Sequence, residues 1–242
     1  MATYFISDLH LSEERPQTTR AFFHFLESIQ GNAENLYILG DFFDAWIGDD
    51  DDSQLPADVA KALAATATTG CNIFLMHGNR DFLMGQPFAD KANAKIIAEN
   101  TVIDLYGTPY LLLHGDSLCT GDASYMQFRQ QVRSPQWQAM ILAQPLAARR
   151  ALAAQLREKS QTMNSLKAED IMDVTPSEVI RVMEEAGINC MIHGHTHRPA
   201  QHPLELSDKS HAQRWVLGDW HDEAWAIKAD SAGVSLFSWT IS

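Results

Sequence analysis

Five short motifs in this chain of 242 residues carry carboxylate, amide and imidazole side chains, the groups that bind divalent metal ions. In chain order they are Asp8-x-His10, Gly40-Asp41-x2-Asp44, Gly78-Asn79-Arg80-Asp81, His114-Gly115-Asp116 and Gly194-His195-Thr196-His197. One such pair by itself is more often structural, but five in a single chain are hard to explain as core histidines. Because no cysteine is among them, a sulfur-preferring site is excluded, whereas manganese, iron and zinc all remain suitable.

Each motif follows a short apolar run that is typical of a buried strand, at residues 4–6, 36–39, 73–76, 110–113 and 190–192. Helix-like stretches at 18–29 and 57–66 separate the early runs, so we expect an α/β architecture with helices covering a sheet. In such sheets the site lies where strand ends give way to loops. Three more runs, at 215–217, 225–227 and 234–237, predict successive strands near the end of the chain.

Residues 121–170 differ from the rest of the chain. They lack strand-like runs, are rich in Ala, Gln, Leu, Met and Arg, and predict two or three helices. Seven basic and four acidic residues give this stretch a net charge of +3, whereas the whole chain carries −13. We therefore expect residues 1–120 and 171–242 to form a core domain, and residues 121–170 to form a basic, partly apolar helical insertion.

The composition sets further limits. With 45% hydrophobic and 20% charged residues the chain has the profile of an ordinary globular protein, and its net charge of −13 argues against broad nucleic-acid binding. Cys71, Cys119 and Cys190 are widely spaced, so no disulfide partner is evident and a reducing cytosol fits. We find no signal peptide and no apolar run long enough to span a membrane.

The five motifs resemble those of the calcineurin-like metallophosphoesterase superfamily, whose ordered pattern is DxH, GDxxD, GNH followed by an acidic residue, GH and GHTH. The resemblance extends from Asp8 to His197. It implies a sandwich of two mixed β-sheets flanked by helices, with two divalent ions at the strand ends. It assigns one ion to Asp8, His10, Asp41 and His197, and the other to Asp41, Asn79, His114 and His195, with Asp41 bridging.

Two ions about 3.5–4 Å apart activate a bridging water as a nucleophile and neutralise phosphoryl oxygens. The resemblance makes Mn²⁺ the first choice of metal. Three further carboxylates, those of Asp44, Asp81 and Asp116, either orient ligand histidines or cap turns.

Arg80 stands where the superfamily pattern usually has a histidine that protonates the leaving oxygen. An arginine stays protonated, but it binds phosphate oxygens through two parallel hydrogen bonds. A phosphoanhydride expels a weakly basic phosphate and needs no acid, so Arg80 favours cleavage of a pyrophosphate. The alternative is a surface arginine paired with Asp81.

Asn79-Arg80 and the basic insertion make the whole chain resemble closely the branch of the superfamily that acts in lipid A biosynthesis. The resemblance implies water attack on the α-phosphate of UDP-2,3-diacylglucosamine, which releases UMP and 2,3-diacylglucosamine 1-phosphate. It implies catalytic roles for Asp41, Asn79, Arg80 and His195. It places the substrate against Asn79, Arg80, Asp122, Ser160, Asn164, Lys167 and His195, of which Ser160, Asn164 and Lys167 share one helix face.

Two properties of the insertion have alternative explanations. Its apolar residues either line a slot for two acyl chains or pack the insertion on the core. Arg149, Arg150 and Arg157 either meet anionic lipid headgroups or form a solvated helix face. We expect a cytoplasmic protein held peripherally at the inner membrane. The rival functions are a pyrophosphatase of soluble nucleotides or dinucleoside polyphosphates, and a scaffold without activity; the complete ligand set disfavours the scaffold.

Overall fold

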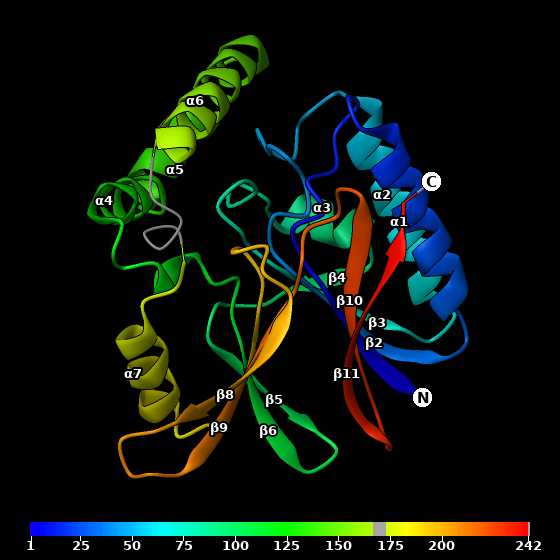
Figure 1. The fold of residues 1–242 in the computed structure, drawn as a ribbon. Helices are drawn as coiled ribbons and strands as arrows, with labels where there is room; N and C mark the ends of the chain where they lie inside the picture. The colour runs from blue at the N-terminus through cyan, green and yellow to red at the C-terminus, as the bar shows by residue number, and fades with distance from the viewer. Residues whose placement is uncertain (167–172, 242) are drawn as a thin grey trace.

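Two β-sheets stack face to face in the computed structural model, which describes residues 1–166 and 173–241, without the side chains of residues 159–166 (Figure 1). The six-stranded sheet has the order β11 (Gly233–Thr240), β10 (Glu223–Asp230), β1 (Ala2–Ile6), β2 (Ala33–Leu39), β3 (Asn72–Met76) and β4 (Ala94–Ile96). The five-stranded sheet has the order β5 (Thr101–Leu105), β6 (Thr108–Leu112), β7 (Cys190–His193), β9 (His211–Val216) and β8 (Ala200–Glu205). Both sheets mix parallel and antiparallel pairs, so the predicted sandwich is confirmed.

The apolar runs of the central strands are continuous because both faces of these strands are buried. Side chains alternate along a strand. Tyr37 and Leu39 of β2 therefore pack against the other sheet, in a cluster with Leu112 and Ile192. Leu36 and Ile38, the alternate residues of β2, pack under the helices on the outer face.

Helices α1 (Pro16–Ile29), α2 (Gln54–Ala67) and α3 (Gln86–Lys91) cover the six-stranded sheet, and α7 (Pro176–Ala186) packs on the five-stranded one (Figure 1). The helix predicted over 18–29 begins two residues earlier, at a proline whose fixed φ suits the first turn of a helix. The helix predicted over 57–66 is also confirmed, and extends from Gln54 to Ala67.

The insertion holds three helices within its described part, α4 (Ala123–Val132), α5 (Pro135–Leu142) and α6 (Leu146–Leu166), as the sequence predicts. They follow a short 3₁₀ turn (Asp116–Leu118) and stand beyond one end of the sandwich (Figure 1). None of the described helices is long and apolar enough to cross a bilayer.

Arginines of the insertion bind carboxylates of the core. Arg149 donates to Asp50 (2.7 Å) and to the backbone oxygen of Ile47 (2.5 Å), and only 4% of its side chain is exposed. Arg150 pairs with Asp51 and Asp52. Arg157 pairs with Asp44 and Glu14. These arginines therefore do not form a purely solvated helix face, which corrects that expectation from the sequence. Contact of the half-exposed Arg150 with anionic lipid stays a prediction.

We expect Arg149→Met to loosen the insertion, because it removes charge-assisted hydrogen bonds to Asp50 and Ile47. Hydrogen bonds to charged groups contribute roughly 1.5–3 kcal/mol each, so amide exchange in α5 and the first turns of α6 should become at least about tenfold faster. Arg150→Met is the matched control and should change exchange little, because its pairs lie at the surface. Equal exchange in the two variants would contradict this reading of Arg149.

Candidate metal centre

The predicted ligands lie at the ends of five strands from both sheets. Asp8 and His10 follow β1, Asp41 follows β2, and Asn79 follows β3. On the other sheet, His114 follows β6, while His195 and His197 follow β7. Strands β1, β2 and β3 are parallel, as are β6 and β7, so within each sheet these ends reach the same edge.

Five of these residues have a left-handed backbone, which side chains other than glycine rarely adopt. The φ angles are 56° at Asp8, 48° at His10, 48° at Asp41, 67° at His195 and 54° at His197. Such residues cost about 1–3 kcal/mol each and concentrate at functional sites. The chain therefore turns sharply after β1, β2 and β7, and the surrounding structure holds it there.

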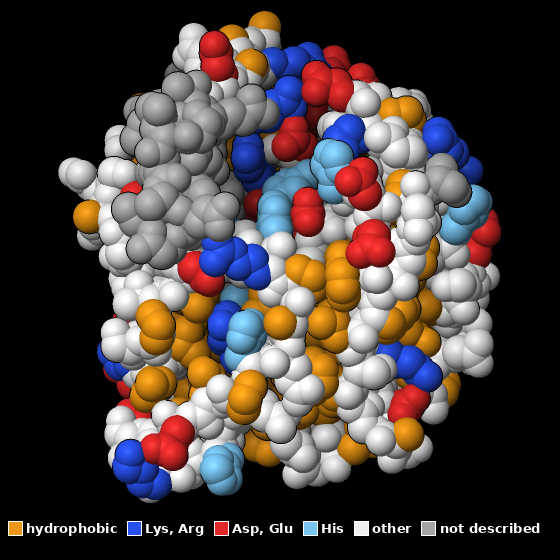
Figure 2. Space-filling view, in the orientation of Figure 1, with side chains coloured by type: hydrophobic (Ala, Val, Ile, Leu, Met, Phe, Trp, Pro, Cys, Tyr) orange, Lys and Arg blue, Asp and Glu red, His pale blue; other side chains and the backbone are white. Residues whose placement is uncertain are grey.

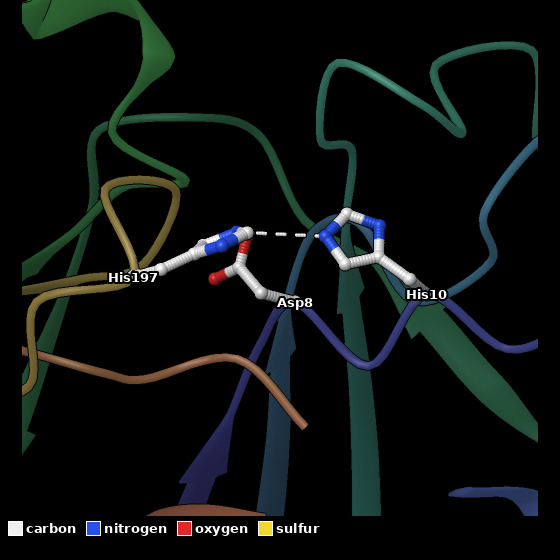
Figure 3. Close-up of side chains that lie close together, drawn as sticks. All are labelled: Asp8, His10 and His197. Carbon is white, nitrogen blue, oxygen red and sulfur yellow. Dashed lines mark hydrogen bonds and ion pairs between the residues drawn. The ribbon is translucent and has the colours of Figure 1, made fainter. Parts of the chain in front are cut away.

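Asp8, His10 and His197 form one group of potential ligands (Figure 3). Nε2 of His197 lies 3.4 Å from Oδ1 of Asp8 and 3.5 Å from Nε2 of His10. Nε2 of His10 lies 3.9 Å from Oδ2 of Asp41. Figure 3 shows the two imidazole rings pointing toward each other from opposite sides of the Asp8 carboxylate.

Asp8, Asp41 and His114 form the second group. Nε2 of His114 lies 3.6 Å from Oδ1 of Asp41 and 2.9 Å from Oδ1 of Asn79. Nδ1 of His114 donates to the backbone oxygen of Leu39 at 2.8 Å, which leaves Nε2 as the ligand nitrogen. The ring of His195 lies beside that of His114, with centroids 5.0 Å apart. The structure thus brings all seven predicted metal ligands to one place.

Two glycines of the motifs allow these groups to come so close. A Cβ atom on Gly78 would lie 2.1 Å from Oδ1 of Asp41, and one on Gly194 would lie 2.2 Å from Oδ2 of Asp8. Any side chain there would displace a carboxylate from the centre. Glycine, which has no Cβ, is therefore what lets these carboxylates pack against the backbone at both places.

The electrostatics fit positive charge at this point. Oδ1 of Asp8 is buried and accepts no hydrogen bond from any described residue. Burial, with the carboxylates of Asp81 and Asp8, raises the pKa of Asp41 to about 7. Burial lowers the pKa of His10 to about 3 and that of His195 to about 4, so both rings are neutral, the state that binds metals. Oxygen and imidazole donors around an unmet negative charge suit divalent cations.

The guanidinium of Arg80 has no partner among the residues that the structure describes. Its backbone N–H donates to Oδ1 of Asp41 at 2.8 Å, so the residue is fixed beside the ligands. No side chain that the structure describes pairs with its guanidinium, which lines a cavity instead. The alternative pairing with Asp81 is wrong, because the oxygens of Asp81 accept backbone N–H groups of Phe42 and Gly78, each at 2.7 Å.

The other two acidic residues of the motifs also have partners away from the ligand histidines. Asp44 pairs with Arg157. Asp116 is buried and accepts from Arg129 at 2.8 Å and from the Tyr125 hydroxyl at 2.6 Å. Of the two expectations for these carboxylates, orientation of a histidine by hydrogen bonding is therefore not observed. Asp44 and Asp116 join the insertion to the core, and Asp81 joins two loops of the site.

Asp81→Ala should strongly destabilise the fold, because two buried N–H groups lose their acceptor. At about 1–3 kcal/mol for each unsatisfied donor, we expect the free energy of unfolding to fall by roughly 2–6 kcal/mol in urea denaturation. Asp90→Ala removes a surface carboxylate that binds only Gln86, and serves as the control. If the two variants unfolded at the same urea concentration, the bridging role of Asp81 would be refuted.

A cavity of about 590 Å³ joins the ligands to the insertion. Its polar lining includes the motif residues His10, Asp41, Asn79, Arg80, His195 and His197. Its apolar lining includes Phe128, Trp137, Ile141, Leu152 and Leu156, all from the insertion. In Figure 2, histidine and acidic side chains gather in a hollow of this face, with basic side chains beside them.

Asp122 also lines the cavity, and it caps α4 by accepting from the backbone N–H of Tyr125 at 3.0 Å. The side chains of Ser160 and Asn164 and all of Lys167 lie outside the described residues. Sequence reasoning missed Tyr125, whose ring stacks on that of His195 with centroids 6.1 Å apart. The only feature of the sequence that could have pointed to Tyr125 was its position three residues after Asp122, a predicted substrate contact.

Comparison with known proteins agrees with this geometry. Residues 1–199 match the family model described as calcineurin-like phosphoesterase. A protein of Cellvibrio japonicus named UDP-2,3-diacylglucosamine hydrolase is 64% identical over 100% of both chains. Two further relatives have the same name. The protein from Marinobacter nauticus is 54% identical over 95% of this chain and 93% of its own length. The protein from Pseudomonas aeruginosa is 51% identical over 96% of this chain and 97% of its own length. The chain is therefore an enzyme of the calcineurin-like phosphoesterase family, whose members bind two divalent metal ions.

Proposed function

We propose that this chain hydrolyses the pyrophosphate bond of UDP-2,3-diacylglucosamine, giving UMP and 2,3-diacylglucosamine 1-phosphate, a step of lipid A biosynthesis. The names of relatives that are 51–64% identical support this substrate. The observation that supports the proposal is the lining of one cavity, which combines the carboxylate and imidazole groups of the motifs, an arginine with no side-chain partner among the described residues, and apolar side chains of the insertion. A phosphate-linked lipid needs both environments in one site.

We assign one ion to Asp8, His10, Asp41 and His197, and the other to Asp41, Asn79, His114 and His195. Bound there, two ions supply an activated water and neutralise phosphoryl oxygens. Mn²⁺ is the proposed metal, on the strength of the family resemblance. Arg80 holds oxygens of the pyrophosphate through its fork of N–H groups, and Asn79 and His195 hold the reacting phosphate beside it. The water oxygen bonds to the α-phosphorus as the bond from that phosphorus to the bridging oxygen breaks. The sugar 1-phosphate leaves with the bridging oxygen and needs no proton from Arg80, and the protons of the water pass to solvent.

The insertion, residues 121–170, is proposed to be a substrate-binding cap on a core formed by residues 1–120 and 171–242. Its apolar cavity walls, such as Leu152 and Leu156, would contact acyl chains. Asp122, Ser160, Asn164 and Lys167 are proposed to bind the sugar, the acyl amide and a phosphate.

We further propose that the protein works in the cytoplasm at the inner membrane, bound peripherally. The lipid nature of the proposed substrate supports this location. Met140 and Leu142 support it as well, because they are 53% and 41% exposed on α5, a helix that also contributes Trp137 and Ile141 to the cavity lining.

The test is product analysis in H₂¹⁸O with the metal-loaded protein and a panel of UDP-sugars, with and without acyl chains. We expect UMP carrying one ¹⁸O, and turnover of the acylated substrate far above that of soluble nucleotides. Release of UDP or inorganic phosphate would overturn the proposed reaction. Equal turnover of soluble nucleotides would instead identify a nucleotide pyrophosphatase.

The role of the apolar walls has its own test. Leu152→Gln should raise KM for the acylated substrate and leave turnover of a soluble UDP-sugar unchanged, because Leu152 belongs to the apolar lining that is proposed to contact the acyl chains. Val102→Gln, at an exposed position on β5, is the matched control. If KM rose for both substrates, or for neither, the proposal that Leu152 contacts the acyl chains would be refuted.

A further inference from the structure

Asp219 is a carboxylate beside the metal centre that belongs to none of the five motifs. It lies in the loop between β9 and β10, and its Oδ2 is 3.7 Å from Nδ1 of His197. The other nitrogen of that ring, Nε2, faces Oδ1 of Asp8 at 3.4 Å. The imidazole of His197 therefore has the ligand group on one side and Asp219 on the other.

The backbone on both sides of Asp219 is tied to the strand ends of the site. The N–H of Leu217 donates to the backbone oxygen of His193 at 2.8 Å, and the N–H of Trp220 donates to that of Asp8 at 3.1 Å. Trp220 is fully buried, and its backbone oxygen accepts from Arg15 at 2.5 Å. Asp219 is thus held between two anchored neighbours, at a fixed place relative to Asp8 and to the loop that carries His197.

The side chain of His197 is the most exposed of the four predicted ligand histidines. It is 38% exposed, against 13% for His10 and 0% for His114, and His195 is intermediate. His114 has the backbone oxygen of Leu39 to fix its tautomer, whereas among the described residues the group that faces Nδ1 of His197 is the carboxylate of Asp219. An imidazole binds a cation through the nitrogen without a proton, so the acceptor on the other nitrogen decides which nitrogen is available.

We propose that Asp219 is a positioning residue of the metal centre, which accepts the Nδ1 proton of His197 and so presents Nε2 to the ion held with Asp8 and His10. The inference rests on the metal centre proposed above. The contact of 3.7 Å is longer than a hydrogen bond, and we expect it to shorten when Nε2 is engaged. Among the described residues, the Asp219 side chain makes no other hydrogen bond or ion pair, so its carboxylate is available to His197.

The test is titration of the metal-stripped protein with Mn²⁺, with free Mn²⁺ followed by its electron paramagnetic resonance signal. Loss of an outer partner of a ligand histidine costs about 10–100-fold in metal affinity. We expect Asp219→Ala to weaken one of two sites by that factor and to leave the other unchanged. Asp219→Asn keeps one acceptor oxygen and should weaken the same site less. Asp222→Ala is the matched control, since Asp222 lies in the same loop against His221, outside the centre.

Activity provides a second readout that a merely structural role would not give. The loss of kcat in Asp219→Ala should be large at limiting Mn²⁺ and should disappear at saturating Mn²⁺, with the melting temperature unchanged. An isotherm equal to that of Asp222→Ala would overturn the proposal, as would equal weakening of both sites. Because Mn²⁺ binding is measured without substrate, failure of the proposed substrate would leave this result standing.

Discussion

Asp41→Asn should reduce kcat/KM for UMP release by more than about 100-fold, the upper end of what losing an outer partner of a metal ligand costs. Asp41 is 2% exposed, and its two oxygens face different histidines, Oδ2 toward His10 and Oδ1 toward His114. An asparagine offers one neutral oxygen, so it cannot serve both groups or balance two cations. Metal analysis of the purified variant should find fewer than two ions per chain.

Asp58→Asn makes the same chemical change at an exposed carboxylate of α2 and should leave activity and metal content unaltered. An Asp41→Asn protein that kept both ions and most of its activity would disprove the bridging role.

Arg80→Ala should lower kcat/KM about 10- to 150-fold, which corresponds to the roughly 1.5–3 kcal/mol of a hydrogen bond to a charged group. Within the described part of the chain the guanidinium is unpaired in the cavity, so its removal breaks no ion pair there. Both ions should therefore remain, as measured by metal analysis. Arg80→Lys keeps the charge without the planar fork and should fall between the wild type and Arg80→Ala.

Arg181→Ala is the control for loss of an arginine, because Arg181 lies on α7 and pairs with Glu178 and Glu185 of the same helix. It should match the wild type in both assays. Loss of metal in Arg80→Ala, rather than loss of turnover, would show that Arg80 supports the ligands instead of the phosphate.

The central strands and the place where the ligands meet could be predicted from the sequence for one physical reason. Parallel strands buried on both faces are continuous apolar runs, and each run ends where its motif begins. The strands that were missed, β4, β5 and β8, all lie at sheet edges. Edge strands are short and partly solvated; β8 even contains Pro203, a residue that argues against a central strand.

Partners that come together only through the fold could not be predicted. Arg149 and Asp50 are 99 positions apart, and no local pattern links them. The opposite net charges of the insertion and the core indicated that the two attract each other, but not which residues pair. From the sequence, the arginines of the insertion were therefore assigned to lipid or solvent. Asp219 was missed for the same reason. It belongs to no motif, and it lies near His197 because β9 pairs with β7 in the folded sheet.

The left-handed ligand positions have a consequence for protein engineering. Alanine fits that region of conformational space poorly, whereas glycine and asparagine enter it readily. Alanine substitutions at Asp8, His10, Asp41, His195 and His197 would each strain the backbone as well as remove a ligand. The measured loss of activity would therefore overstate the contribution of the side chain to metal binding. Transplanting this centre to another scaffold would likewise require copying the sharp turns along with the donor atoms.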